Sequence, residues 1–402
     1  MAKATSHFYI ELGSHQTRAC FTHFNEDGKP VLSMFAVQSK GIALGQIRDQ
    51  ALAKDAVNSL LEDVDSSGLY ECSKCILCLP PAVTTFRTID CSVRLNGLSV
   101  SKDHRVQLLS EAQAAICDDT QELVEIVEQN WRLDGQLFDQ FPTGKIGEQI
   151  VLSGFCVVIE KNILKDLVEV LNASGLSIIG TKSSILGAKR LIERLSPDLS
   201  NRAILDFGYQ STSGILCVGS KENSTFVVKA GSQHVTRDIA AAMQIDLSIA
   251  ESLKIEYGLS TNRSEPNTSE SKGSHSIYPW AAPRVLEIVS LCLRNFAIYA
   301  KALDGGVILM GGGSQLQEIC GFLGSKFLGI KFTRFKPSFA LLSDALSVDF
   351  RCSDESNIIG FEGMIGIANE QIEIDRIKME RITRQTPKFL RPILSWFVEL
   401  SK

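Results

Sequence analysis

The sequence predicts a mixed α/β fold made of two related halves, with an α+β unit inserted in the first half. A strand–turn–strand pattern at residues 8–24 is repeated at residues 203–218, and such a repeat of one supersecondary unit indicates a duplicated fold. Residues 86–155 show a different succession of strands, helices and turns. They are interpreted as the insert, because the surrounding pattern resumes after them. Within residues 305–324 a buried strand runs into a triple glycine and then a helix, which is typical of an α/β junction.

The two repeated turns are candidates for binding one phosphate chain from both sides, because successive backbone N–H groups in such turns can point at an anion. Their nucleotide-binding candidates are Gly13, Ser14, His15, Gln16, Asp206, Gly208 and Ser211. An acid ends the first strand of each unit, so Glu11 and Asp206 are predicted to hold a hydrated Mg²⁺ ion through water. Each turn can also be a hairpin without a ligand, and the sequence leaves this alternative open.

Residues 231–258 predict a glycine turn, a first helix, a break at residues 244–246 and a second helix. The second helix is predicted to end at Gly258, which suits a left-handed C-cap. Ser248 and Glu251 fit an S-x-x-E capping box at its start. Apolar residues four positions apart predict its buried stripe: Ile249, Leu253 and Tyr257.

Two further groups are candidates for contacting a ligand. Glu251 and Lys254 lie three positions apart on the second helix, where charged residues can pair with each other or together contact something polar. The triple glycine Gly311, Gly312 and Gly313 allows close backbone approach to a purine face or a phosphate. Any α/β junction can have such glycines, so this signal is weak when taken alone.

The remaining pattern divides the chain into units. Within the insert we expect a helix from about 103 to 116, then another strand and helix around Val124; later, a long helix runs from about 283 to 303. The predicted units are a first half at 1–85 and 156–200, completed by about 335–370; the insert at 86–155; a second half at 201–231 and 300–334; a helical unit at 232–299 with a polar loop at 260–277; a basic linker at 371–387; and a terminal helix at 388–402.

The terminal segment is predicted to lie on a membrane surface. Its apolar residues recur at spacings of three and four and are flanked by basic residues, as in an interfacial amphipathic helix. The membrane-binding candidates are Lys388, Phe389, Arg391, Ile393, Leu394, Trp396, Phe397 and Leu400. With Pro392 in the first turn, the helix has about ten residues, too few to span a bilayer. The alternative is a terminal helix docked on the body of the protein.

Composition and charge indicate an ordinary soluble protein that does not bind nucleic acid. Of the 402 residues, 44% are hydrophobic and 22% are charged. Residues 376–402 carry seven Lys or Arg and two Asp or Glu, a net charge of +5, so the overall net charge of −5 leaves −10 on residues 1–375. The acidic body repels nucleic acid, whereas the basic tail attracts anionic surfaces.

Cysteine usage indicates a reducing compartment. The 11 cysteines show no paired spacings, and we find neither a signal-peptide pattern nor an apolar run long enough to span a membrane. Cys72, Cys75 and Cys78 have spacings found in zinc and iron–sulfur sites. No fourth ligand lies nearby in the sequence, and the run is interpreted as a strand that enters Pro80 and Pro81. We therefore expect no metal at these cysteines.

Four segments and the amphipathic C-terminus together resemble the FtsA family of bacterial cell-division proteins, a branch of the actin-like ATPases. The segments are IELGSH at 10–15, GSQHVTRDIA at 231–240, AESLKIEYG at 250–258 and VILMGGGSQL at 307–316. The resemblance spans nearly the whole chain. It implies an actin-like, ribonuclease H-like duplicated ATPase fold of four subdomains, with ATP and a divalent cation between its two halves.

The resemblance also implies specific contacts and a location. Glu251 and Lys254 would contact the ribose or adenine of ATP, and Gly311 to Gly313 the base and the α-phosphate. The protein would polymerise as a cytoplasmic, peripheral protein on the inner face of the cell membrane, held there by the terminal helix. The unit at 232–299 would bind the C-terminal tail of FtsZ, with Arg284 as one contact, and the protein would help to recruit later division proteins.

The two turns that are predicted to bind phosphate depart from the family pattern. The second loop of the family is typically D-x-G-G-G-T, whereas residues 206–211 read DFGYQS, with one glycine. The lysine that the family has in the first turn is replaced by Gln16. Tyr209 and Gln210 add side chains where close approach to phosphates is needed, and Gln16 removes a positive charge. We therefore expect weakened ATP binding and at most a slow ATPase.

Three alternatives follow. One is a scaffold like PilM, a component of type IV pilus machinery, which shares the insert but ends without an amphipathic anchor. A second is an actin-like scaffold that uses no nucleotide. A third is a phosphotransferase, which would need an intact phosphate loop and a catalytic acid at a substrate cleft, and neither is evident in the sequence.

Overall fold

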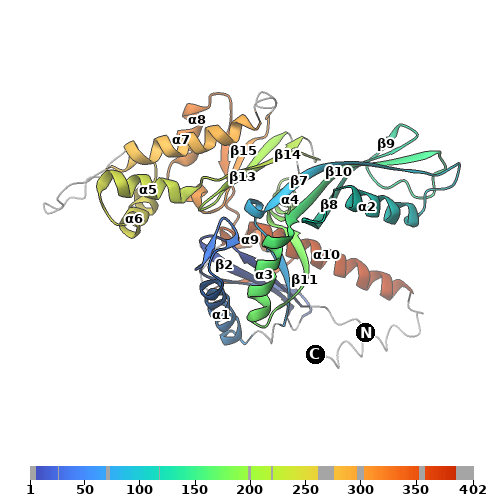
Figure 1. Ribbon diagram of the computed structural model, residues 1–402, viewed down its shortest axis with the longest axis horizontal. Coiled ribbons are helices and arrows are strands. Elements are labelled where there is room, and N and C mark those ends of the chain that lie inside the picture. Colours follow the sequence, from blue (N-terminus) through green and yellow to red (C-terminus); the bar gives the residue numbers. More distant parts are fainter. Residues whose placement is uncertain are drawn as a thin grey trace.

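The computed structural model describes residues 6–25, 27–68, 73–116, 118–197, 201–218, 221–260, 276–296, 303–352 and 358–385. It contains a large sheet in each of two halves and a third sheet that projects to one side (Figure 1). The predicted mixed α/β, duplicated fold is confirmed. None of the helices in the described ranges is long and apolar enough to cross a membrane.

The first sheet has the strand order β11-β6-β1-β2-β3-β17. An antiparallel meander of three strands is extended on one side by two parallel strands, and on the other by β17, which runs parallel to β3. The bounds are β1 His7–Leu12, β2 Gln16–Phe24, β3 Pro30–Gln38, β6 Lys74–Leu79, β11 Ser177–Ser183 and β17 Asp349–Cys352; a small hairpin of β4 Ile42–Ala43 and β5 Gln46–Ile47 lies beside it.

The second sheet, β14-β13-β12-β15-β16, repeats this pairing pattern. Glu11 on β1 pairs with Arg18 of β2, and Asp206 on β12 pairs with Ser213 of β13. The two acids therefore occupy equivalent places, one pair before the turn. The bounds are β12 Arg202–Phe207, β13 Thr212–Val218, β14 Lys221–Val228, β15 Gly306–Met310 and β16 Phe332–Arg334.

Helices cover both faces of both sheets. On the outer face of the first sheet lie α1 (Gln50–Ser66) and α3 (Lys161–Ala173). On its inner face lie α9 (Phe339–Leu346) and α10 (Glu362–Gln385), while α4 (Ser184–Leu195) packs on the facing side of the second sheet. The outer side of the second sheet is covered by α5 (Ser232–Met243), α7 (Tyr278–Arg294) and α8 (Ile319–Lys326), with α6 (Leu247–Tyr257) against α5.

Helices α4 and α10 cross between the two sheets at a distance that only glycine allows. A Cβ atom on Gly366 would lie 1.8 Å from the carbonyl oxygen of Gly187, and one on Gly187 would lie 2.2 Å from the carbonyl oxygen of Gly363. This close crossing brings the first residues of both helices, Ser184 and Glu362, to the ends of β1 and β12.

The insert forms a separate four-stranded antiparallel sheet, β7-β10-β8-β9, with α2 packed on it (Figure 1). The predicted helix near residue 103 is present, but the predicted strand and helix around Val124 are one continuous strand, β8, paired along its length with β10. The bounds are β7 Thr84–Arg94, α2 Lys102–Ile116, β8 Gln121–Leu133, β9 Gln136–Phe138 and β10 Gln149–Glu160.

Two other predictions need correction. Helix α7 begins at Tyr278 and not at Pro283, because the ring of Tyr278 packs against Phe322 and Ala281 is buried, which adds a turn before the proline. Residues 371–385, predicted as part of a linker, continue helix α10; the sequence has neither glycine nor proline between Gly366 and Pro387 to end it. The predicted terminal helix at 388–402 lies outside the described residues and stays a prediction.

The strand predicted through the cysteine cluster is present as β6, where Cys75 and Cys78 are buried thiols. Burial raises the pKa of Cys78 well above its ordinary value. Across the described residues, no group of three or more His, Cys, Asp or Glu side chains is arranged to hold a metal. Cys72 itself lies outside those residues.

Candidate functional site

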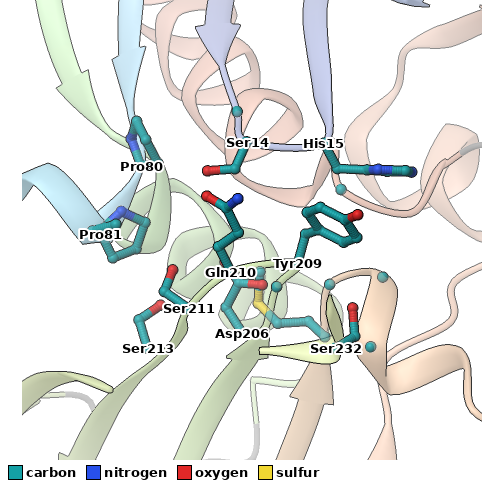
Figure 2. Close-up of a pocket in the computed structure, with 18 of the residues that line it drawn as sticks. Ser14, His15, Pro80, Pro81, Asp206, Tyr209, Gln210, Ser211, Ser213 and Ser232 are labelled. Atoms are coloured by element: carbon teal, nitrogen blue, oxygen red, sulfur yellow. The ribbon is translucent and has the colours of Figure 1, made fainter. Parts of the chain in front are cut away.

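A cavity of about 370 Å³ lies between the two halves, where the repeated turns face each other (Figure 2). This volume is within the range of small-molecule sites. With the exception of Gln16, every nucleotide-binding candidate lines the cavity: Gly13, Ser14, His15, Asp206, Gly208, Ser211, Glu251, Lys254, Gly311, Gly312 and Gly313. Four segments distant in the sequence are thus brought to one place, as the resemblance implies.

The glycine after β15 is required by the geometry of the cavity wall. Gly311 has a φ of +76°, and a Cβ atom there would lie 2.2 Å from Oδ1 of Asp206. By contrast, a Cβ atom on Gly312 would meet nothing within 4 Å. The backbone at Gly312 is therefore open to a flat ligand such as a base, while Gly311 holds the strand of the second half against Asp206.

Side chains of the second turn bridge the gap to the first half. Oε1 of Gln210 accepts a hydrogen bond of 2.7 Å from the backbone N–H of Leu44, in the β4–β5 hairpin. The ring of Tyr209 lies against the ring of His15, with centroids 4.7 Å apart. Figure 2 shows both side chains reaching across toward the first turn. These two cross-cleft contacts occupy the space where two bare phosphate loops would face each other.

The second turn is supported from behind by α5. Nε2 of Gln210 donates to Oε1 of Gln233 at 3.2 Å, and the backbone N–H of Gln233 donates to the carbonyl oxygen of Tyr209 at 2.8 Å. The backbone N–H of Ser232 donates to the carbonyl oxygen of Gly208 at 2.9 Å. The first turn of α5 therefore fixes the positions from which Tyr209 and Gln210 project.

Glu251 and Lys254 do pair with each other, at 2.8 Å between Oε2 and Nζ. Lys254 is only 4% exposed and also donates to Oγ1 of Thr236 at 3.0 Å and to the carbonyl oxygen of Ser232 at 3.3 Å. Burial lowers the pKa of Lys254, while the neighbouring Glu251 opposes that shift. The amine is therefore held by the protein, whereas the glutamate, which is less buried, remains on the cavity wall.

The predicted buried stripe and capping box of α6 are both wrong. Ile249 is 49% exposed and Tyr257 is 44% exposed, whereas Ala250 and Lys254 are buried. The N-cap is Asp246, with no side-chain capping bond, and Ser248 lies inside the helix. The ion pair and the cavity determine which face turns inward. The predicted end at Gly258, with a φ of +53°, is confirmed.

Three carboxylates and one guanidinium form the cleft floor, defined here as Glu11, Arg18, Asp206 and Glu362. Nη1 of Arg18 lies 3.5 Å from Oε1 of Glu11, and Ser184 donates a short hydrogen bond to the same carboxylate. Burial raises the pKa of Glu11, that of Asp206 to about 6 and that of Glu362 to about 7. The positive charge of Arg18 opposes all three shifts.

The predicted Mg²⁺ site does not fit this donor set. Within the described ranges no cluster of three metal-ligand side chains is present, and Glu11, one of the two predicted ligands, is already paired with a guanidinium. Ser184 donates its hydroxyl hydrogen to Glu11 as well. A divalent ion here would have to compete with a fixed positive charge, so we derive no step through a metal.

The sequence reasoning missed Arg18 and Glu362, and did not foresee that Tyr209 and Gln210 bridge the cleft. Arg18 could have been found, because it lies two positions after Gln16 on the same face of β2 and donates to its Oε1 at 3.0 Å. Glu362 has no local signal, since a long-range helix crossing brings it to the site. Its Oε2 accepts the backbone N–H of Gly360 at 2.7 Å.

Arg284, the predicted partner contact, does not line the cavity. Its Nε donates to Oδ2 of Asp238 on α5 at 2.6 Å, and its Nη1 donates to Oε2 of Glu287 at 2.6 Å. The guanidinium is partly exposed on the α5–α7 surface. Its predicted contact with a partner stays a prediction.

The chain matches a family model and several curated proteins. The model described as "Cell division protein FtsA" matches residues 203–345. Cell division protein FtsA of Bacillus subtilis (strain 168) is 22% identical over 333 residues, covering 77% of this chain and 74% of the relative. That of Enterococcus hirae is 20% identical over 356 residues, covering 84% and 80%.

Solved structures share the fold. A chain of the PilM–PilN type IV pilus biogenesis complex aligns with a TM-score of 0.67 at 18% identity, covering 92% of this chain and 99% of that one. MreB 5 of Spiroplasma citri bound to AMPPNP aligns with a TM-score of 0.50 at 12% identity, covering 94% and 99%. These likenesses support the actin-like fold. The family model and the curated relatives show that the chain is similar to the FtsA cell-division proteins, and the solved structures show that it shares the actin-like fold.

Proposed function

We propose that the protein is a division scaffold that polymerises on the cytoplasmic face of the membrane, binds the C-terminal tail of FtsZ and helps to recruit later division proteins. Support comes from the family model and the curated relatives. The terminal segment adds the basic and apolar pattern of a surface anchor. In this proposal the protein is peripheral, and the units that contact FtsZ are the helices α5 to α7.

The observation that favours a scaffold over a cycling ATPase is the pair of cross-cleft contacts. Gln210 with Leu44 and Tyr209 with His15 join the two halves through groups of the protein itself. In an actin-like fold that depends on ATP, the nucleotide phosphates supply that connection. A protein whose own side chains supply it can keep a closed shape whether or not nucleotide is present.

We propose further that the cleft holds the adenosine end of ATP and turns it over slowly or not at all. The open backbone at Gly312 and the partly exposed Glu251 offer a surface and an acceptor for base and ribose. The neighbour MreB 5 is described as bound to AMPPNP. The bridged phosphate side argues for weak binding of the triphosphate. The donor set does not favour the predicted magnesium ion, and the proposal does not require it.

A second candidate is a PilM-like assembly scaffold. It is favoured by the alignment that covers 99% of the chain from the PilM–PilN complex. The terminal segment distinguishes this candidate from the division scaffold, because a PilM-like protein needs no amphipathic anchor of its own.

Co-pelleting with anionic liposomes, with and without ATP and an FtsZ tail peptide, tests the proposal. We expect the full chain to pellet and to carry the peptide with it, and Trp396→Glu to lose most of the pelleted fraction. Leu328→Glu is the matched control, because Leu328 is 87% exposed on the body. Full chain that stays in the supernatant would refute the division scaffold and favour the second candidate.

Calorimetry with ATP tests the nucleotide part separately. We expect weak binding by the wild type and weaker binding by Glu251→Ala. Absence of binding at millimolar ATP would show that the scaffold uses no nucleotide, and it would leave the membrane and FtsZ parts of the proposal standing.

A further inference from the structure

The wall of the cavity has more acidic than basic side chains. The acids are Glu11, Asp206, Glu251 and Glu362, and the bases are Arg18 and Lys254. Nη1 of Arg18 lies 3.5 Å from Oε1 of Glu11. Nζ of Lys254 lies 2.8 Å from Oε2 of Glu251. These two ion pairs carry no net charge, so the net charge of the wall comes from the other two acids.

Asp206 and Glu362, the other two acids, make the wall net negative at slightly alkaline pH. Burial raises the pKa of Asp206 to about 6 and that of Glu362 to about 7. Both carboxyls are therefore mostly ionised at about pH 8. Burial also lowers the pKa of His15, so its imidazole is neutral under the same conditions. A ligand that carries negative charge is repelled by this wall.

Backbone donors beside the second turn are already used by the protein. The N-terminus of a helix can bind an anion through its first N–H groups. In α5, however, the N–H of Ser232 donates to the carbonyl oxygen of Gly208 at 2.9 Å, and that of Gln233 donates to the carbonyl oxygen of Tyr209 at 2.8 Å. The N–H of Gly208 donates to the carbonyl oxygen of Ser211 at 3.0 Å. These three N–H groups are not available to a phosphate.

The same wall suits a ligand that donates hydrogen bonds. Ionised carboxylates accept hydrogen bonds and cannot donate them. The hydroxyls of a ribose and the exocyclic amine of adenine are donors, whereas phosphate oxygens are charged acceptors. The partly exposed Glu251 offers an acceptor, and the backbone at Gly312, which lines the same cavity, offers an open flat surface. The chemistry of the wall therefore favours a nucleoside over the same nucleoside with phosphates attached.

We propose that the ligand of this cleft is an uncharged nucleoside of the adenosine type, and that each added phosphate weakens its binding. This inference rests on the adenosine site of the proposed function and changes the class of ligand from a nucleotide to a nucleoside. Tyr209 and Gln210 exclude phosphates by filling the space between the turns. Asp206 and Glu362 exclude them by charge, because like charges repel strongly where water is partly excluded.

Calorimetry of the full chain with adenosine, AMP, ADP and ATP, at about pH 8, tests the inference. We expect adenosine to bind most tightly and ATP most weakly, with dissociation constants that differ by about tenfold. Each nucleotide is measured once with EDTA and once with excess Mg²⁺, so that the metal-bound triphosphate is included. ATP that binds as tightly as adenosine in either condition would overturn the inference.

Asp206→Asn tests the electrostatic cause, because it removes one charge with little change of shape. We expect the difference between adenosine and ATP to shrink by about threefold, mainly through tighter binding of ATP. Glu362→Gln is the second variant, with the same expected direction. Asp349→Asn is the matched control, because that acid lies on β17 outside the cavity, paired with Lys29, and should leave the difference unchanged. An unchanged difference in both cleft variants would overturn the electrostatic account on which the inference stands.

The outcomes separate this inference from the proposed function. Absence of adenosine binding at millimolar concentration would overturn the inference, while the liposome assay decides the membrane and FtsZ parts by itself. Binding of ATP in preference to adenosine would also overturn the inference, but it would support the nucleotide part of the proposed function.

Discussion

The side-chain oxygen of Gln210 accepts a hydrogen bond of 2.7 Å from the backbone N–H of Leu44, and this bond joins the two halves of the protein across the cleft. Gln210 belongs to the turn after β12, whereas Leu44 belongs to the β4–β5 hairpin of the first half. Opening of the cleft must break this bond. The exchange of the Leu44 amide hydrogen with solvent therefore reports on cleft opening.

We expect Gln210→Ala to speed the exchange of the Leu44 amide by about fivefold, because a typical intramolecular hydrogen bond contributes about 1 kcal/mol. Hydrogen–deuterium exchange measures this directly. Gln233→Ala is the control, since it removes the bond to Nε2 of Gln210 but leaves the bond from Leu44 in place. Unchanged exchange in Gln210→Ala would show that the bond does not hold the cleft closed.

The double change Tyr209→Gly and Gln210→Gly is expected to raise the affinity for ATP by about tenfold, equivalent to about 1.4 kcal/mol. The two substitutions remove the ring that lies against His15 and the amide that reaches Leu44. The bare turn can then approach phosphates closely. Calorimetry on the double variant and on Gln233→Ala makes the comparison, and equal affinities would contradict this account.

Gly366→Ala is expected to destabilise the fold by at least about 1–3 kcal/mol, the usual cost of overpacking a tight contact. The added Cβ atom would lie 1.8 Å from the carbonyl oxygen of Gly187, so α4 and α10 must separate. Gly324→Ala in α8 is the control, because nothing lies within 4 Å of its Cβ position, and alanine there should stabilise by about 0.5–1 kcal/mol. Denaturant unfolding compares the two; a Gly366→Ala protein of wild-type stability would refute the close crossing.

Glu362 makes stability depend on pH. Burial raises its pKa from 4.5 to about 7. The folded state therefore holds this proton more tightly than the unfolded state, and the free energy of unfolding falls as pH rises from about 4.5 to about 7. The loss is on the order of 3 kcal/mol, and Glu362→Gln should abolish it while still accepting the N–H of Gly360.

Denaturant unfolding of the wild type and of Glu362→Gln, at about pH 5.5 and about pH 8, checks the sign of this pH dependence. We expect the variant to gain stability relative to the wild type at the higher pH. Parallel pH dependences for the two proteins would mean that the carboxyl of Glu362 is ionised throughout this range.

Removal of Glu251 alone is expected to cost more than removal of the whole ion pair. Glu251→Ala leaves the buried amine of Lys254 without its carboxylate. We expect a loss of about 1–3 kcal/mol, below the usual 3–5 kcal/mol for a buried pair because Glu251 is partly exposed. The double variant with Lys254→Met should recover part of that loss in a double-mutant cycle. Strictly additive losses would indicate that the pair contributes nothing.

Local patterns predicted much of this molecule, because strands, turns and their repeats are local features. The repeated units at Glu11 and Asp206 are paired in equivalent registers. The face of α6 could not be predicted in the same way. Apolar residues lie on more than one side of that helix, so hydrophobic periodicity alone does not identify its buried face. Ile249 is exposed, whereas Ala250 is buried.

The chemistry of the cleft floor was less predictable, because it depends on contacts between distant segments. The guanidinium of Arg18 packs against Gly360, more than 300 residues later in the chain, where a Cβ atom would lie 2.4 Å from Nη2. Glu362 reaches the cleft only because three glycines let α4 and α10 cross closely. The resemblance located the turns and the glycine junction, but it did not identify the charges that those turns enclose.

Helix α10 links this floor to the other end of the molecule. It begins at Glu362 in the cleft and runs without interruption to Gln385, and its 24 residues span about 36 Å. Because such a helix is stiff, a rotation of about 5° at its first turn would displace its last turn by about 3 Å. A change in the orientation of α10 at the cleft would therefore be carried along the whole helix to Gln385.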